Sequence, residues 1–445
     1  MKAVLIEENY VDKDYRSTYY NFYSKKGLRY RTDCVRLHFF DGTVRFDRKT
    51  LRLVSSVDQR LTDHYFGYMV LRPTGIVTIA RTVLSPDVRS GARGRIITAN
   101  HKVHVLGYKL EVEGFPSMDQ HHDIAVCAHV ACWSVLRHYS EAYSIYREFL
   151  TYDITMMAQE FDPGGLVPSK GLQLSHAERV FQEAGTFPVL IARRKDVRTD
   201  ASFYRQLLAY VESGFPLFAA MQSKQHAVAI IGYEWRAPLV TTVRGMRYAW
   251  DEVESFAVVD DNTLPYLSIP IKGGVPYSAE DVDSFIVALP EKVFYPADAV
   301  DRVAPTLFKL RHLVDLPAKD GVVIRYFMTT GSGFRQFVRS RESEFDPKLL
   351  ETIMSLPFAQ FIWIVEFATK SQWAVGQVAA RAVIDATASL MDVMPLWLMH
   401  GYKKALVFSR RSLDFRSGGR DLQLSDMGHK GYTRMEQNLR STRAK

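Results

Sequence analysis

The chain has 445 residues, of which 47% are apolar and 24% are charged. This is an ordinary composition for a folded globular protein of two or three domains. The formal net charge is +8, but +5 of it lies between Arg410 and Lys445. Because the rest of the chain is nearly balanced, nucleic acid is not an expected partner.

Three cysteines (Cys34, Cys127 and Cys132) are too few for a disulfide framework in a chain of this length. No apolar stretch is long enough to span a bilayer. The first residues also lack the apolar centre of a signal peptide. We therefore expect a reduced, cytoplasmic protein without a membrane partner.

Residues 1–112 contain alternating apolar and polar runs, which are typical of strands. The dipeptide Asp41-Gly42 lies between two such runs, and this pattern predicts a β-hairpin that turns there. No catalytic motif is evident in this part of the chain. We expect residues 1–112 to form a β-rich N-terminal domain.

Residues 113–300 change in character to helices that are followed by strands. From Cys127 onward, apolar residues recur at three- and four-residue spacing, which predicts a helix with one buried face. Strands are predicted for the apolar runs at 216–221, 226–232 and 255–260. Helices first and strands afterwards indicate an α+β domain.

Residues 301–408 predict a mixed α/β C-terminal domain whose fold the pattern does not identify. Its predicted elements are strands at 322–328, 361–367 and 381–386 and helices at 334–342 and 347–356. Residues 409–445 contain Gly and Ser, lack apolar periodicity and carry much of the positive charge. We expect this last segment to be a basic, flexible tail.

Cys127 is the candidate nucleophile because it opens the predicted helix. Unpaired N–H groups and the positive end of the helix dipole favour the thiolate, which is the form that attacks a carbonyl. Gln120, a little upstream, can donate a side-chain N–H to a developing oxyanion beside the backbone N–H of the cysteine. Cys132 lies five residues into the helix, where no free N–H groups remain, so Cys127 is preferred.

His226 begins an apolar strand that ends in Gly232-Tyr233. A fixed backbone and a dry environment suit a base that must hold one orientation. Asp260 ends the next apolar strand, where a carboxylate can accept the other imidazole N–H and select the tautomer. Asp261 follows directly, and the sequence leaves open which of the two carboxylates has this role.

In the order Gln, Cys, His and Asp, these residues resemble the papain-like cysteine peptidase superfamily. The nearest likeness is to the branch that trims leader peptides after double-glycine sites, and it covers about residues 115–290. The resemblance implies a papain-like domain, Cys127 as nucleophile and His226 as base and then acid. It further implies Asp260 as the orienting carboxylate and Gln120 as the oxyanion donor, without a cofactor.

The chain departs from the family pattern in three places. Cys127 is followed by Ala-His where Gly-Pro is usual, and Asp260 is followed by Asp261 rather than Pro. Gln120 lies seven positions before Cys127, about one residue farther than the family pattern has it. Each residue also has a structural explanation when it is taken alone. A lone Cys on an apolar helix is usually a core residue, and a polar cluster after a strand is usually a turn. The joint order of the pieces favours the catalytic interpretation.

A metal site is the competing use of the crowded Cys and His residues. The set comprises His121, His122, Cys127, His129 and Cys132. On a helix, however, Cys127 and Cys132 would point about 140° apart, so the side chains do not converge. We expect no metal.

The sequence therefore predicts an α+β protein whose papain-like domain is flanked by two others. We expect a cysteine peptidase that hydrolyses a peptide or isopeptide bond of a protein substrate through a thioester on Cys127. The flanking domains are expected to choose the substrate or to hold a protein partner. An amidase, a deamidase or a transglutaminase-like acyltransferase would use the same residues, and a non-catalytic papain-like binding module is the alternative from another class.

Overall fold

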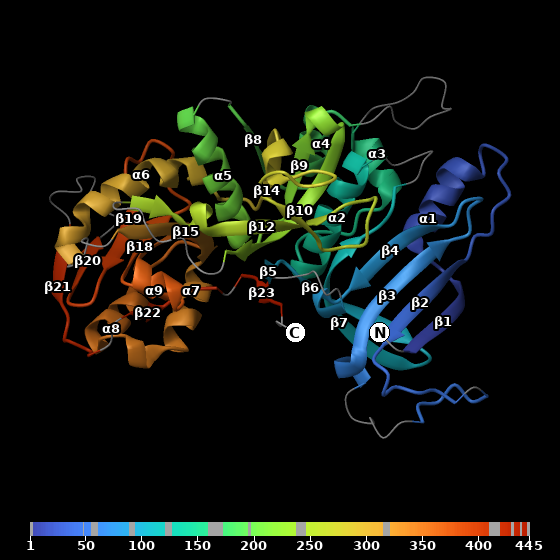
Figure 1. The fold of residues 1–445 in the computed structure, drawn as a ribbon, viewed down its shortest axis with the longest axis horizontal. Helices are drawn as coiled ribbons and strands as arrows, with labels where there is room; N and C mark the ends of the chain where they lie inside the picture. Colours follow the sequence, from blue (N-terminus) through green and yellow to red (C-terminus); the bar gives the residue numbers. More distant parts are fainter. Residues whose placement is uncertain are drawn as a thin grey trace.

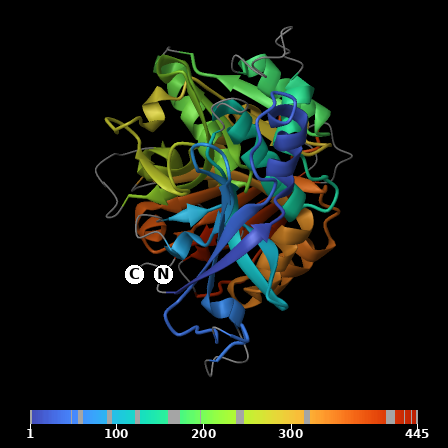
Figure 2. The ribbon, with the colours of Figure 1, turned by 90° about the vertical axis from the view of Figure 1, so that its right-hand side faces the viewer.

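The computed structural model describes residues 3–47, 49–54, 61–88, 94–120, 127–158, 172–194, 197–236, 246–314, 321–408, 419–428, 431–436 and 438–442. It has a mixed α+β fold with three large sheets. Figure 1 shows the sheets in a row, with the N-terminal sheet at one end and the C-terminal sheet at the other, and Figure 2 looks along this row from the N-terminal end.

The N-terminal sheet has six antiparallel strands in the order β1-β2-β3-β4-β7-β6. Their bounds are β1 (Ala3–Tyr10), β2 (Cys34–Phe40), β3 (Tyr65–Arg72), β4 (Thr78–Leu84), β6 (Ala99–Val105) and β7 (Tyr108–Ser117). Buried residues alternate with more exposed ones along β2 and β6, because successive side chains of a strand point to opposite faces. Helix α1 (Lys13–Thr18) adds Tyr15 to the apolar cluster of this sheet. The expected β-rich domain is therefore present.

The predicted hairpin at Asp41-Gly42 is wrong. Strand β2 pairs with β1 and β3, and the Asp41 carboxylate turns the chain locally by accepting the Thr43 N–H at 2.9 Å. A hairpin does form between β6 and β7, where Leu106 and Gly107 have left-handed backbones (φ 49° and 83°). Because β7 runs to Ser117 and pairs with β4 there, the sheet extends past the predicted boundary at residue 112.

The middle domain has helices α2 to α5 and a sheet in the order β13-β12-β10-β9-β14-β8, with β5 added beside β10. The bounds are α2 (Cys127–Ala142), α3 (Thr151–Ala158), α4 (Leu174–Glu183), α5 (Val197–Glu212), β5 (Arg95–Ile96), β8 (Phe187–Ala192), β9 (Leu217–Met221), β10 (His226–Trp235), β12 (Val253–Val259), β13 (Leu267–Pro270) and β14 (Ser284–Leu289). The three predicted strands correspond to β9, β10 and β12. Helices α2 and α5 both pack on β10, and Figure 1 shows them flanking the sheet.

Gly232 has a structural reason in this sheet. Strand β5 pairs with β10 at Gly232 and Tyr233. A Cβ added at Gly232 would lie 2.3 Å from the backbone oxygen of Arg95. Only glycine permits this close approach of two backbones.

The C-terminal sheet has seven strands in the order β11-β15-β16-β18-β19-β20-β21. Its strands are β11 (Met246–Tyr248), β15 (Val322–Thr330), β16 (Phe361–Thr369), β18 (Ala380–Asp385), β19 (Leu396–His400), β20 (Lys404–Phe408) and β21 (Gly419–Gln423), and its helices are α6 (Ala297–Lys309), α7 (Gly331–Arg339), α8 (Pro347–Ser355) and α9 (Lys370–Ala374). The predicted strands and helices of residues 301–408 are observed. Strand β11 precedes the predicted boundary at residue 300 but pairs in parallel with β15, so the middle and C-terminal domains share this edge.

The expectation of a flexible tail is wrong for the described residues after 418. Strand β21 extends the C-terminal sheet, β22 (Tyr432–Thr433) pairs with β17 (Gln377–Val378), and β23 (Arg440–Ser441) pairs with β5. Ion pairs also join this segment to residues near the N-terminal sheet, since Arg440 contacts Asp87 at 2.7 Å and Glu436 contacts Arg95. Strands of two residues leave no periodic signal in a sequence, which is why the pattern did not predict them.

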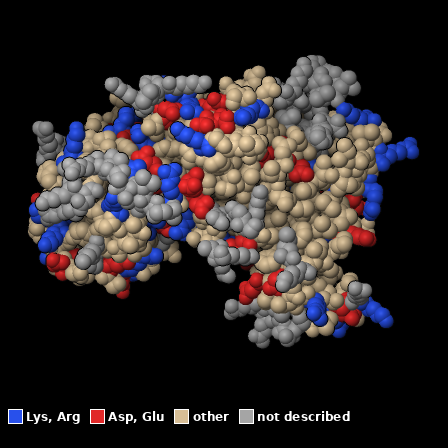
Figure 3. All heavy atoms as spheres, viewed as in Figure 1, with Lys and Arg blue, Asp and Glu red and all other residues tan. Residues whose placement is uncertain are grey.

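On the face shown in Figure 3, Lys and Arg are interspersed with Asp and Glu. Among the helices that the structure describes, none combines the length and the apolar character needed to cross a membrane.

Candidate active site

Cys127 is the first residue of α2, as the apolar periodicity predicts. From Ala128 to Tyr139 the helix is buried, whereas Cys127 is only partly buried. The other two cysteines, Cys34 and Cys132, are buried. The start of the helix therefore carries the most accessible thiol of the chain.

His226 is the first residue of β10, and the following residues Ala227 to Tyr233 are buried. The turn between β9 and β10 ends at Gln225, whose backbone is left-handed (φ 48°) and whose N–H donates to the Gln222 carbonyl at 3.1 Å. This turn places the imidazole near the surface of the middle domain, and 14% of the His226 side chain is exposed. The strand fixes the backbone of the histidine while its ring stays accessible.

Asp260 directly follows β12 and is 2% exposed. Its Oδ1 lies 3.2 Å from Nε2 of His226, within hydrogen-bond distance, whereas Asp261 Oδ1 lies 3.9 Å from the same nitrogen. Antiparallel pairing of β10 with β12 brings the two residues together. Of the two carboxylates that the sequence left open, Asp260 is the one positioned to orient the imidazole.

Two further residues hold Asp260, and sequence reasoning assigned neither of them. The Tyr277 hydroxyl donates to Oδ2 of Asp260, and the Asn262 backbone N–H donates to Oδ1 at 2.8 Å. The Asn262 side-chain amide donates to Oδ1 of Asp261 at 2.9 Å. Adjacency to the acidic pair could have pointed to Asn262. Tyr277 belongs to a turn region whose sequence gives no comparable signal.

Cys127 and His226 line the same pocket, and Cys127 is among the groups that raise the pKa of His226. Because Nε2 faces Asp260, Nδ1 is the ring nitrogen left for the sulfur. The structure thus places Cys127 and His226 at one pocket and Asp260 beside the imidazole, and the catalytic roles of the three residues stay predictions.

The protonation of His226 and Asp260 follows from these contacts. Burial by itself lowers the pKa of His226, but its hydrogen bonds to Asp260 and Cys127, with the charges of both, raise that pKa to about 10. Burial raises the pKa of Asp260, but the hydrogen bonds from His226, Tyr277 and Asn262 outweigh it and hold that pKa well below its usual range. An imidazolium paired with a carboxylate is therefore the expected state at neutral pH.

Asp261 behaves differently from its neighbour. Burial and the hydrogen bond to Asp260 raise the pKa of Asp261 to about 7. Its side chain is 1% exposed, and two adjacent carboxylates do not ionise together easily. Asp261 thus holds a proton over much of the acidic range, and Asp260 carries the charge.

A pocket of about 710 Å³ opens in front of Cys127 and His226. Its lining residues are Cys127, Ala128, Leu172, Gln173, Leu174, Ser175, Phe218, Ala220, Met221, Gln222, Gln225, His226 and Ala227. Asp260 is absent from this set because it lies behind the imidazole. No Lys, Arg, Asp or Glu occurs among the described lining residues, so the space beside the thiol suits an uncharged, mainly apolar group.

Gln120 lies on the acidic side of the site. Its side-chain Nε2 donates to Oδ1 of Asn262 at 3.4 Å, which links it to the residue that holds Asp260. It is not among the described residues that line the pocket. The role of Gln120 as an oxyanion donor stays a prediction, and the backbone N–H of Cys127 is the other donor expected there.

Cys132 has a structural environment. It is fully buried, and burial raises the pKa of its thiol. Its neighbour Trp133 donates its indole N–H to Asp14 of the N-terminal domain at 3.1 Å. Burial likewise raises the pKa of Cys34 to about 12. Both thiols are expected to be inert.

His129 does not belong to a metal site in the described part of the chain. It is fully buried, and burial lowers its pKa to about 4, so its ring is neutral. His121 and His122 lie outside the described residues.

His226, Asp260 and Asp261 form the group of described residues that could hold a metal ion, since their ligand atoms lie within 4.8 Å of one another. However, O–H and N–H donors already point at the Asp260 oxygens, and Nε2 of His226 does so as well. Such donors suit a carboxylate paired with an imidazolium better than a cation. The expectation of no metal stays a prediction.

Comparison with known proteins gives no relative, because no protein-family model, no curated protein and no solved structure matches the chain. The functional assignment therefore depends on the geometry and the chemistry of the site.

Proposed function

We propose that this protein is a cysteine hydrolase of the papain-like kind that cleaves a peptide or isopeptide bond. The observation that supports this most is the position of His226. His226 lines one pocket together with Cys127, which lies at a helix start, and its Nε2 faces the buried Asp260 at 3.2 Å. Nucleophile, base and orienting carboxylate come from α2, β10 and the end of β12, which is the arrangement that an activated cysteine requires.

The reaction would begin with attack of the Cys127 thiolate on the carbonyl carbon of the substrate. A C–S bond forms, and the carbonyl oxygen becomes an oxyanion that the backbone N–H of Cys127 and the amide of Gln120 would stabilise. The imidazolium of His226 then gives its proton to the leaving nitrogen as the C–N bond breaks, which leaves a thioester. Asp260 keeps the ring oriented throughout.

Hydrolysis of the thioester would use the same residues in reverse. Neutral His226 takes a proton from a water molecule, whose oxygen attacks the thioester carbon. The C–S bond breaks, and the acid product leaves Cys127 as a thiolate beside a newly protonated imidazole. No metal or organic cofactor is needed, and a reducing compartment such as the cytoplasm suits a free thiol nucleophile.

Apart from Cys127 and His226, the described lining of the pocket is uncharged, which supports an amide substrate whose groups next to the scissile bond carry no charge. The N-terminal and C-terminal domains flank the site, and we propose that they hold the protein substrate or a protein partner. An amidase, a deamidase and an acyltransferase share the acyl-enzyme step and differ only in the leaving group or the acceptor. The alternative from another class is a binding module in which Cys127 does not react.

Thiol reactivity tests this proposal against the binding-module alternative. The intact chain is treated with limiting iodoacetamide at neutral pH, and mass spectrometry compares the labelling of its three cysteines. We expect Cys127 to react at least about tenfold faster than the buried Cys34 and Cys132, which are internal controls in the same molecule. Preferential labelling of Cys132 or Cys34 would overturn the assignment.

Formation of the thioester is the second measurement. The chain is incubated with an activated ester, and the mass of the intact protein is recorded at short times. We expect one acyl group on the wild type and none on Cys127→Ser or His226→Ala. Equal acylation of all three proteins would favour the non-catalytic alternative.

A further inference from the structure

The N-terminal sheet has a second apolar side, which we call the outer face. Residues that lie directly opposite each other in an antiparallel sheet point to the same side. The register of the strands therefore defines the members of each row on this side. The outer face consists of two such rows, which are Ile6, Leu37 and Met69 on β1 to β3 and Val35, Leu71 and Ile79 on β2 to β4.

The outer face belongs to neither apolar core of the described residues. The opposite side of the same strands carries Phe40, Tyr68 and Val70, which are buried in the apolar cluster of the N-terminal domain. None of the six outer-face residues belongs to that cluster or to the larger cluster of the middle and C-terminal domains. Ile6 is 60% exposed, and the other five are partly exposed. The sheet thus packs with one apolar side only.

The residue pattern of the strands is that of a sheet with two covered sides. An antiparallel sheet that is covered on one side normally has polar residues on the other. On β2, however, the apolar residues Val35, Leu37 and Phe39 alternate with the buried ones. The turn between β3 and β4 adds Ile76 and Val77, which are 72% and 64% exposed. This apolar surface indicates a docking site.

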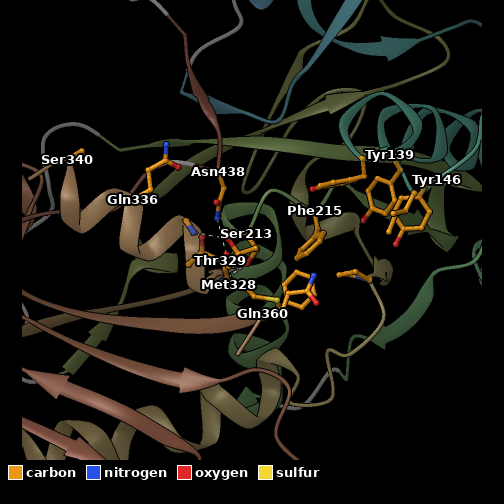
Figure 4. A pocket seen from close by; sticks show the side chains of 16 residues that line it. Tyr139, Tyr146, Ser213, Phe215, Met328, Thr329, Gln336, Ser340, Gln360 and Asn438 are labelled. Atoms are coloured by element: carbon orange, nitrogen blue, oxygen red, sulfur yellow. Dashed lines mark hydrogen bonds between the residues drawn. The ribbon is translucent and has the colours of Figure 1, made fainter. Parts of the chain in front are cut away.

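The junction between the middle and C-terminal domains shows the contrast. There Tyr139 and Phe215 are buried, and Asn438 joins the two domains by donating to the carbonyls of Glu212 and Met328 (Figure 4). The N-terminal sheet lies at one end of the molecule (Figure 1), and its outer face is exposed to solvent. Another molecule can therefore approach this face.

The size of the outer face fits an interface between two copies. Four strands at a spacing of about 4.8 Å, with eight residues of about 3.3 Å each in β1 and β3, give a face of about 19 by 26 Å. Its projected area of about 500 Å² is at the upper end of the apolar patches that monomers expose. Side-chain relief and the adjoining turn bring the accessible area closer to the about 800 Å² that each partner buries in a stable dimer.

The absence of charge favours a second copy over a charged partner. The two rows contain no Asp, Glu, Lys, Arg or His, and few charged side chains lie over β2 and β3 in Figure 3. In a two-fold dimer the same surface of both copies meets itself, so a charged face would repel its own copy. An uncharged apolar face is complementary to itself.

We propose that the outer face is a dimer interface, in which two copies of this chain pack their N-terminal sheets face to face about a two-fold axis. The two sheets would lie about 10 Å apart and form the apolar core of a β-sandwich. Leu37, which lies between Ile6 and Met69 in its row, would be near the centre of this core. The proposal goes beyond the hydrolase function and does not depend on Cys127.

Sedimentation velocity of the full chain at increasing concentration tests the proposal. We expect a dimer at micromolar concentrations, and added salt should not weaken it because no charged pair holds the interface. Leu37→Glu and Ile6→Glu should each raise the dissociation constant of the dimer at least about a hundredfold, since each buries a carboxylate without a partner. Val375→Glu is the matched control, because Val375 is a 69% exposed residue of the C-terminal domain, and it should dimerise like the wild type.

All three variants should keep the fold, because the replaced side chains are exposed or partly exposed. A thermal melt and the alkylation rate of Cys127 verify this. A wild type that stays monomeric at about 100 μM, a dimer that both outer-face variants leave intact, or a dimer that salt dissociates would overturn the proposal. A monomeric wild type that binds phosphatidylcholine vesicles through Leu37 would overturn it too and would assign the outer face to a membrane surface.

Discussion

Among the clusters of buried charge in the described residues, two have very different surroundings. The arginine cluster consists of Glu212, Arg325, Glu366 and Arg381. The histidine cluster consists of His226, Asp260 and Asp261. The first connects helix α5 to the C-terminal sheet, and the second lies beside the Cys127 pocket.

The arginine cluster is closed. Arg325 contacts Glu212 at 2.8 Å and Glu366 at 2.7 Å, and Arg381 contacts the other oxygen of Glu366 at 2.9 Å. All four side chains are at most 1% exposed. Charges that are fully withdrawn from water in this way must keep their partners. The cluster therefore couples elements of the fold and offers nothing to a ligand.

The histidine cluster is open on one side. Asp260 and Asp261 are buried as deeply as the arginine cluster, but the imidazole of His226 keeps 14% exposure and faces a thiol and a pocket. The group with the raised pKa is therefore one that a substrate can reach. The comparison teaches that burial alone does not identify function. A charged cluster that is open to a pocket beside a reactive atom is the better indicator of function.

Replacing His226, the partly exposed residue of the histidine cluster, should have the largest effect on activity. His226→Ala is expected to lower the acylation rate at least about ten-thousandfold, or about 5 kcal/mol, because the thiol loses both its base and the imidazolium beside it. The melting temperature should fall by no more than several degrees, because the variant loses only the stabilisation that the ion pair with Asp260 provides. Single-turnover acylation and a thermal melt measure the two quantities, with the exposed His104→Ala as the control. A variant that melts far lower and still acylates would mean that His226 is structural.

Removing a charge from the arginine cluster should lower the stability of the fold and leave activity unchanged. Glu366→Gln leaves Arg325 and Arg381 without a shared carboxylate, and the free energy of unfolding should fall by about 3–5 kcal/mol. Under native conditions the alkylation rate of Cys127 should not change. Denaturant unfolding is the measurement, and Glu342→Gln in the exposed pair with Arg339 (both side chains 59% exposed) should cost less than about 1 kcal/mol. Equal losses in the two variants would contradict the distinction between a closed cluster and a surface pair.

The two carboxylates of the histidine cluster should differ in importance. Asp260→Asn is expected to lower acylation about a hundredfold, or about 3 kcal/mol, because the partner of Nε2 loses its charge. Asp261→Asn should lower it less than about tenfold, since that carboxyl lies farther from the ring and is largely protonated in acid. Rates of the two variants at neutral pH measure the difference. The reverse order would assign the orienting role to Asp261.

The smallest expected effect is on the pH dependence of stability. The folded pKa of His226, about 10, lies above its ordinary value of 6.5. The stabilisation is therefore complete below about pH 6.5 and is lost as the pH rises toward 10. We expect the melting temperature of the wild type to fall by a few degrees more than that of His226→Ala across this range. Parallel curves for the two proteins would show that the histidine does not carry this stabilisation.

The elements that carry the site could be predicted from the sequence because their signals are local. The start of α2 at Cys127 and the strands that begin at His226 and end before Asp260 follow from apolar periodicity alone. The choice between Asp260 and Asp261 could not be made that way. It depends on the register of β10 with β12, and a shift of one residue along a strand exchanges its two faces.

Long-range partners account for most of what the sequence did not predict. Tyr277 contacts Asp260 from a different segment, 17 positions later, and no sequence pattern near Tyr277 predicts this contact. The turn at Asp41 has ordinary hairpin chemistry, yet β2 finds its partners in β1 and in the more distant β3. Local propensity predicts a turn but not which strands will pair across it.

The pairing of β23 with β5 has a consequence for the order in which the nascent chain can fold. Strand β5 is translated early, but its partner includes Arg440, and Arg95 finds its acidic partner Glu436 only 341 positions later. At about 5–20 residues per second, a ribosome needs roughly 20 to 70 s to deliver that partner. Until then β5, which pairs with the His226 strand β10, lacks its second partner β23. Cotranslational folding can therefore complete the N-terminal sheet early, whereas the sheet of the candidate active site is completed only when the end of the described chain has emerged.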